Sequence, residues 1–162
     1  MIKSCNKFLL AISVMSGTCS VYAASSPTDV TTQSADIVFS SPSTTTIKLT
    51  PIKGLVAGQH ALNDIFANLA VSTTNGNVAF RWTPNIGTVD SSGNLTLSGK
   101  NNNKNHITLA ASSAGDKTFT LGTDGWFVGN APSLSANIVD SQDGTIAADT
   151  YTLSMDAASW VS

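Results

Sequence analysis

The chain contains no glutamate, and only 11% of its 162 residues are charged. Its ten acidic residues are all aspartates, and lysine and arginine together number eight. The sequence also contains no basic cluster. A nucleic-acid-binding surface needs clustered lysine and arginine to neutralise phosphates, and a polybasic membrane anchor needs the same. The composition therefore argues against nucleic acid and against an anionic membrane surface as partners.

Cysteine is scarce, and both copies, Cys5 and Cys19, lie near the N-terminus. Residues 1–7 carry two lysines, residues 8–15 form an apolar run, and a small residue, Ala23, follows. This order is typical of a secretory signal peptide. A transmembrane anchor is the alternative, but the apolar run is far shorter than the roughly 20 residues that a span needs. We expect cleavage after Ala23, which leaves a mature chain without cysteine and with six basic side chains against ten aspartates.

Residues for catalysis or metal binding are also few. The mature chain would have no thiol and has no glutamate, and its two histidines, His60 and His106, stand alone in polar surroundings that predict surface positions. No Gly-x-Ser-x-Gly nucleophile motif is present. Residues 140–144 only faintly resemble a calcium loop, and a β-turn is the better interpretation. The sequence predicts no enzyme, no cofactor and no metal site.

Apolar residues alternate with polar ones over short runs, separated by turn-forming clusters, and no segment strongly predicts a helix. A short apolar stretch at residues 60–67 is ambiguous between helix and strand. Asn75-Gly76 is a strong turn signal, because both residues tolerate positive φ. We expect strands at residues 44–52, 64–73, 78–83, 94–98, 106–112, 117–121, 125–128, 134–139 and 150–156. Such a pattern predicts an all-β antiparallel sandwich or barrel.

Three tryptophans offer broad apolar faces that could stack on sugar rings. Trp82 lies in an alternating strand, which favours a place in the core. Trp126 is flanked by Gly125 and lies near Gly129, and we expect it to be a surface contact.

The two ends of the mature chain are complementary. Residues 35–39 place Ala35, Ile37 and Phe39 on one face of an extended segment, which Pro42 separates from the next strand. The last expected strand places Tyr151, Leu153 and Met155 on one face, and residues 157–162 are too few for another strand after a turn. An open sheet edge is a template for a foreign strand. Spacing alone leaves open whether residues 35–39 complete their own domain or that of a neighbour.

Residues 35–42, Ala-Asp-Ile-Val-Phe-Ser-Ser-Pro, and residues 47–58 resemble the N-terminal region of the Saf pilins, which are chaperone–usher pilins of surface fibrils. Residues 148–153 are similar to the final strand of that family. The resemblance implies an incomplete immunoglobulin-like β-sandwich that is completed by a donor strand from a neighbouring subunit. It implies identical subunits, a periplasmic chaperone and an outer-membrane usher as partners, a host receptor as a further one, and a place in the fimbria at the cell surface.

On this resemblance, residues 1–23 are the signal peptide, residues 24–43 the donor-strand extension and residues 44–162 the immunoglobulin-like pilin domain. The expected donor-strand residues are Val30, Ala35, Ile37 and Phe39. The expected acceptor groove is formed by Ile47, Leu49, Tyr151, Leu153 and Met155. The predicted function is that of a structural fimbrial subunit with a role in adhesion. The alternative is a secreted, self-contained β-sandwich that binds carbohydrate or protein.

Overall fold

The computed structural model describes residues 31, 33–37 and 42–161. The chain divides into two units, Met1–Val38 and Phe39–Ser162. The predicted signal peptide and two of the predicted donor residues, Val30 and Phe39, lie outside the described residues. In the first unit, residues 31 and 33–37 contain no helix or strand. Across the described residues, no helix combines the length and the apolar character needed to cross a membrane.

In residues 42–161, the second unit consists of short antiparallel strands and one 3-10 turn, η1 (Thr123–Gly125). The strands are β1 (Thr45–Pro51), β2 (Gly58–His60), β3 (Ile65–Thr73), β4 (Asn77–Trp82), β5 (Thr88–Val89), β6 (Leu95–Ser98), β7 (His106–Ala114), β8 (Phe119–Leu121), β9 (Phe127–Gly129), β10 (Ser133–Asp140), β11 (Gly144–Ile146) and β12 (Met155–Trp160). Each observed pairing is antiparallel, as the alternating sequence pattern predicts.

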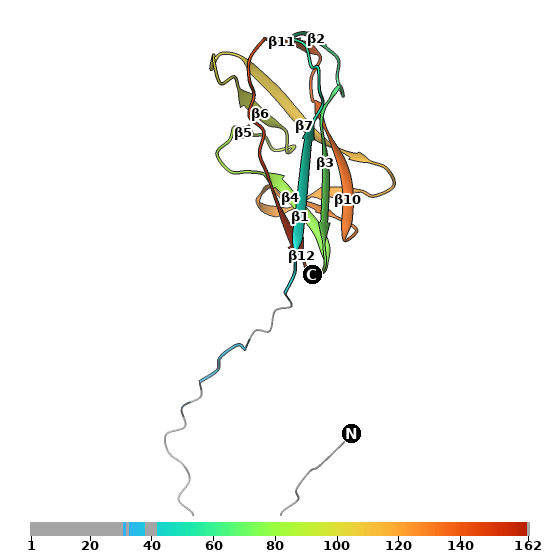
Figure 1. Ribbon diagram of the computed structural model, residues 1–162. Helices are drawn as coiled ribbons and strands as arrows, with labels where there is room; N and C mark the ends of the chain where they lie inside the picture. Colours follow the sequence, from blue (N-terminus) through green and yellow to red (C-terminus); the bar gives the residue numbers. More distant parts are fainter. Residues whose placement is uncertain (1–30, 32, 38–41, 162) are drawn as a thin grey trace, which may run out of the picture. The chain divides into compact units, whose positions relative to one another are not determined.

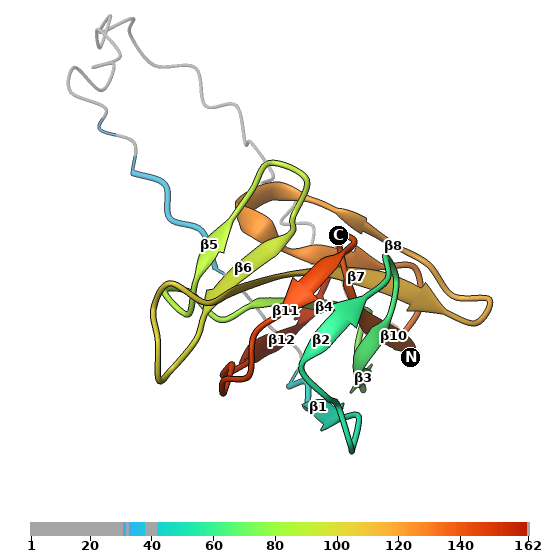
Figure 2. The ribbon, with the colours of Figure 1, turned by 90° about the horizontal axis from the view of Figure 1, so that it is seen from above.

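Three sheets organise these strands. A six-stranded sheet has the order β1-β3-β10-β7-β6-β5, and a four-stranded sheet has the order β12-β4-β9-β8 (Figure 1). The two-stranded sheet of β2 and β11 lies at the end of the unit toward which β1 runs, and Figure 2 shows its strands side by side. The prediction of an all-β sandwich is confirmed.

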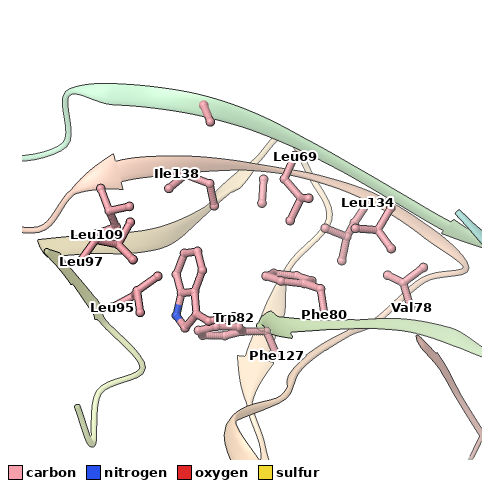
Figure 3. Packing of buried hydrophobic residues seen from close by; sticks show 13 residues of the cluster. Leu69, Val78, Phe80, Trp82, Leu95, Leu97, Leu109, Phe127, Leu134 and Ile138 are labelled. Carbon is pink, nitrogen blue, oxygen red and sulfur yellow. The ribbon is translucent and has the colours of Figure 1, made fainter. Parts of the chain in front are cut away.

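The core lies between the two larger sheets. Phe80 and Trp82 of β4, together with Phe127 of β9, face Leu69 of β3 and Ile138 of β10 (Figure 3). The rings of Phe80 and Phe127 stack with centroids 5.1 Å apart, and Trp82 meets Phe127 edge-on at 6.2 Å. The Trp82 indole donates a hydrogen bond to the Gly93 carbonyl oxygen at 2.8 Å, so its one polar atom is satisfied. Trp82 therefore lies in the core, as predicted.

The Asn75-Gly76 turn forms as expected, and Gly76 has a φ of +71°. A Cβ at this position would overlap the carbonyl oxygen of Trp160. The turn therefore requires glycine both for its positive φ and for this close approach. However, β3 and β4 belong to different sheets. The turn therefore carries the chain across the sandwich and does not close a hairpin.

The structure differs from the sequence predictions at the last strand and in three short strands, and it settles the one ambiguous stretch. The final strand spans Met155–Trp160 and not residues 150–156, so residues 157–160 belong to the strand itself. The ambiguous stretch 60–67 is not helical, because His60 ends β2 and β3 begins at Ile65. The short strands β2, β5 and β11 were not predicted, since two or three residues are too few to show an alternating pattern.

Candidate functional site

The sandwich is open along one side, between β1 and β12. β1 is an edge of the six-stranded sheet and β12 is an edge of the four-stranded sheet. In the described part of the chain, β1 pairs with β3 alone and β12 with β4 alone. The two strands lie close together but do not pair with each other (Figure 1). We call this gap the seam; backbone N–H and C=O groups on both of its sides are free to pair with a further strand.

Side chains along β1 show that the core is uncovered at the seam. Ile47 lies opposite Val71 in the β1–β3 register, and Leu49 lies opposite Leu69, so all four share the inward face. Val71 and Leu69 are 2% and 1% exposed, but Ile47 is 38% exposed and Leu49 is half-buried. These residues share an orientation but differ in their neighbours, because Val71 and Leu69 lie inside the sheet whereas Ile47 and Leu49 lie on its edge strand.

An apolar cavity of about 470 Å³ opens where β1 ends at Pro51. Its floor reaches the buried core residues Leu97 and Leu109. Its lining comes from β1, β2, β3, β6, β7 and β11, from the loop between β1 and β2, and from the segment before β12. The apolar and aromatic lining residues are Leu49, Leu55, Val56, His60, Phe66, Leu97, Ile107, Leu109, Ile146, Tyr151 and Leu153. A space of this size and polarity suits apolar side chains delivered by another segment of chain.

One wall of the cavity is the segment of residues 147–153, which precedes β12 and belongs to no strand. Tyr151 and Leu153 line the cavity and pack against the core while half-buried. The Tyr151 hydroxyl donates to the Ala147 carbonyl oxygen at 3.2 Å, and burial raises the pKa of this phenol. Met155, the first residue of β12, lies opposite Trp82 and also packs against the core. The structure thus brings Leu49, Tyr151 and Leu153 to one cavity, with Ile47 and Met155 along the adjoining seam.

Asp149 holds this wall to the loop of residues 99–105. Its carboxylate accepts hydrogen bonds from the Asn101 N–H at 2.8 Å, the Asn101 side chain at 2.9 Å, the Asn102 N–H at 3.0 Å and the Asn105 side chain at 3.0 Å. The Thr150 N–H adds a fifth at 2.7 Å. These donors, the Asn101 N–H first, lower the pKa of Asp149 to about 2. We call this arrangement the Asp149 clasp.

His60 is not the free surface residue that the sequence predicts. Its side chain is 15% exposed, and its ring meets Phe66 edge-on at 5.4 Å. Its Nε2 lies 2.8 Å from the Val56 carbonyl oxygen, and its Nδ1 lies 3.2 Å from Oδ2 of Asp64. An acceptor faces each ring nitrogen, and this favours the protonated ring. The hydrogen bond to the Val56 carbonyl oxygen has the largest effect, and together with Asp64 it raises the pKa of His60. His60 thereby ties the loop that carries Val56 to the rim of the cavity.

The two predicted donor residues that the structure describes, Ala35 and Ile37, belong to the other unit. Both are exposed, Ile37 at 81%. Neither lies in a strand.

The predicted surface contact, Trp126, is half-buried, and the guanidinium carbon of Arg81 lies 4.6 Å from its ring centroid. Arg81 also donates to Asp156 at 3.2 Å, which fixes the guanidinium over the indole. The ring is therefore partly covered by this chain's own arginine.

Sequence reasoning missed much of the cavity lining. Alternation predicted that Phe66 and Ile107 lie in strands, but nothing in the sequence indicated that both line one cavity. Leu55 and Val56, 50% and 75% exposed, form an apolar pair in a loop, which is a signal that could have been used. The clasp had a signal too, since four asparagines crowd into residues 101–105.

The model of a protein family described as "Saf-pilin pilus formation protein" matches residues 23–161. No curated protein sequence matches the chain significantly.

Several solved structures share the fold. The Salmonella SafD adhesin is 22% identical, with a TM-score of 0.59 over 70% of this chain and 82% of SafD. The Escherichia coli Hda pilus minor tip subunit HdaB is 11% identical, with a TM-score of 0.56 over 70% of this chain and 80% of HdaB. A protein of the enteroaggregative E. coli AAF fimbriae, studied for fibronectin binding and biofilm formation, is 14% identical, with a TM-score of 0.57 over 70% and 86%.

Each of these proteins comes from a fimbria or is an adhesin, and each shares an antiparallel sandwich with this chain. The family match spans nearly the whole chain, including the segments on both sides of the seam. The chain belongs to the Saf-pilin family and is a subunit of a chaperone–usher fimbria, a structural protein of the bacterial surface.

Proposed function

We propose that the seam is the acceptor groove of this pilin, and that the extension of residues 24–43 from a neighbouring copy fills it. The observation that supports this most strongly is the 38% exposure of Ile47, whose inward-facing neighbours on β3, Val71 and Leu69, are almost completely buried. A strand that enters between β1 and β12 would move the two edges apart, pair with both of them and join the two sheets. Alternate side chains of that strand would enter the cavity lined by Leu49, Tyr151 and Leu153.

The proposed donor residues are those that the resemblance indicates. Ala35, Ile37 and Phe39 share one face of an extended segment, whereas Val30, further upstream, is out of step with Ile37 by one residue. Burying Ile37 and Phe39 would contribute about 1.5–3 kcal/mol each. Backbone hydrogen bonds along both edges add to this, so the joint between subunits would open slowly.

The route to the surface follows from the family. Residues 1–23 direct export and are removed, a periplasmic chaperone occupies the seam first, and an outer-membrane usher exchanges it for the extension of the next copy. The fimbria is then a homopolymer of this subunit. Adhesion to a host receptor is a further role, and the adhesin and fibronectin-binding fimbriae among the similar structures support it.

A deletion tests this proposal. The mature chain, residues 24–162, is produced with its periplasmic chaperone and compared with a chain that lacks residues 24–43. The full chain should form ladders of multimers that resist mild denaturant, whereas the shortened chain should remain bound to the chaperone without forming ladders. Adding a peptide of residues 28–41 should release the chaperone from both. If the shortened chain is a stable monomer without any partner, the self-contained module is the correct interpretation.

A point substitution sharpens the test. Phe39→Asp in the same peptide places a charge in an apolar groove, at a cost of several kcal/mol in transfer terms, and should abolish binding. Ser40→Asp in the peptide is the matched control, because residue 40 points to the opposite face of an extended segment. Equal binding by both variant peptides would contradict the assignment of Phe39 as a donor residue.

A further inference from the structure

The wall formed by residues 147–153 has no sheet to hold it. β11 ends at Ile146, and the pairing of β12 with β4 begins at Met155. In the described part of the chain, the hydrogen bonds that tie this wall to the rest of the domain come from the loop of residues 99–105. They are the clasp contacts to Asp149 and a bond from the Lys100 N–H to the Thr150 carbonyl oxygen at 2.9 Å.

The loop is shaped to receive this carboxylate. Gly99 is buried, and a Cβ on it would overlap Oδ2 of Asp149, so the backbone can approach the side chain only because residue 99 is glycine. The Gly99 N–H donates to Asn105 O at 2.7 Å, and the Asn105 N–H donates to Asn102 O at 3.0 Å, which closes the loop on itself. Hydrogen bonds to an ionised acceptor are about twice as strong as neutral ones. One side chain therefore makes most of the hydrogen bonds that hold the wall to this loop.

We propose that Asp149 is a positioning residue for strand exchange: its clasp fixes the cavity wall in the shape that receives the donor strand. This rests on the proposed function of the seam. Asp149 acts through Tyr151 and Leu153, which follow it by two and four residues and line the cavity. Without the clasp, the wall must be ordered each time a donor strand enters, and that cost slows exchange.

The molecule contains a matched control. Asp90 accepts hydrogen bonds from the Ser92 N–H at 2.8 Å, the Asn94 N–H at 2.9 Å and the Asn94 side chain at 3.0 Å, in the turn between β5 and β6. Its pKa is also lowered, by the Asn94 N–H first. It does not line the cavity. Asp90→Asn and Asn94→Ala thus remove a comparable aspartate–asparagine contact away from the seam.

The experiment follows uptake of a fluorescent peptide of residues 28–41 by the mature chain held by its chaperone. Asp149→Asn should slow uptake about tenfold relative to the wild type, because one charged acceptor serves several donors. Asn105→Ala removes one hydrogen bond of the clasp and should slow uptake less. It replaces Asp149→Asn in the test if that variant does not fold. Asp90→Asn and Asn94→Ala should change the rate less than twofold. Thermal unfolding of each variant reports the loss of stability separately.

Three outcomes are distinct. The proposal is supported if uptake is slower in the Asp149 and Asn105 variants alone. The Asp90 and Asn94 variants must then lose a similar amount of melting temperature. Wild-type uptake in the first pair, or equal slowing in both pairs, overturns it and leaves the acceptor groove intact. A wild-type chain that takes up no peptide overturns the proposed function itself.

Discussion

Inward-facing residues are less exposed in the middle of the sandwich than at its seam. In the middle, Leu69 and Phe80 come from opposite sheets and are 1% and 0% exposed. At the seam, Ile47 faces inward beside Val71 but is 38% exposed, and the inward positions of β12 beyond Met155 are the small residues Ala157 and Ser159. Each residue in the middle is covered from both sheets, whereas each residue at the seam lacks a neighbour on one side.

This difference shows what kind of incompleteness the domain has. In the central core the aromatic rings pack against one another, and the Trp82 N–H has a hydrogen-bond acceptor. The proposed deficit lies along one line between two sheet edges, where a single extended segment could supply backbone pairing and apolar side chains together. If this is correct, substitutions in the middle should lower stability whether or not a donor segment is bound, and substitutions at the seam should act mainly on the bound form.

The largest effect is expected in the middle. Phe80→Ala removes a fully buried ring that contacts Phe119 and Phe127, and should lower the free energy of unfolding by about 3–5 kcal/mol. Because the ring packs on Phe119 and Phe127, which lie on the side of β4 away from β12, the loss should be the same with and without bound donor peptide. Urea denaturation of both forms measures it. A loss that donor peptide largely restores would show that the two regions are not separate.

At the seam, the effect should depend on the donor. Leu153 is half-buried in the free subunit and would be covered when the groove is filled. Leu153→Ala should therefore cost the peptide complex about 2–3 kcal/mol, and the free subunit less. Isothermal titration with the peptide of residues 28–41 measures the difference. Equal losses in both forms would place Leu153 in the closed core.

Acid should loosen the seam before the middle. The pKa of Asp149 is about 2 when folded, against 3.8 ordinarily, so the clasp stabilises the folded chain at pH values above about 4. This stabilisation is lost as the pH falls from about 4 toward 2. The melting temperature of the wild type should drop over that window, and that of Asp149→Asn should drop less. Parallel curves for the two proteins would mean that the clasp contributes nothing to stability.

The smallest effect is expected on the outer face of the four-stranded sheet. Trp126→Ala removes the contact with the Arg81 guanidinium, worth about 0.5–1 kcal/mol at an exposed site. Assembly into ladders should be unchanged, since Trp126 does not line the cavity. If Trp126 contacts a receptor, the variant fimbria should assemble normally but bind host cells less. A defect in ladder formation would instead connect this face to the seam.

The sequence predicted the strands that span the sandwich but not how their edges meet. Alternation in residues 64–73 and 78–83 located β3 and β4 to within one residue at each end, because their inward residues are apolar except for Thr73. The last strand was placed too early, since Tyr151 and Leu153 continue its apolar alternation although residues 151–154 leave the sheet to form the cavity wall. Periodicity reports which face is apolar, and it does not report whether the backbone is paired.

The site was harder to predict than the fold. Ile47, Leu49, Tyr151, Leu153 and Met155 were chosen because they alternate near the two ends of the domain, and the structure places them along the seam or in its cavity. His60 and Asp149 were missed as contributors, because their roles depend on contacts with loops that are distant in sequence. The Asp149 clasp joins positions 44 to 48 residues apart.

The most direct test of the account is disulfide trapping across the seam, since the mature chain would contain no cysteine. Ile37→Cys is combined in turn with Ile47→Cys, Leu49→Cys and Leu153→Cys, with each single variant as a control. Oxidation of assembled fimbriae should yield a covalent ladder of subunits in at least one double variant and at most dimers in the single ones. A bond that forms only within one chain, in a monomer that stays monomeric at high concentration, would contradict the account.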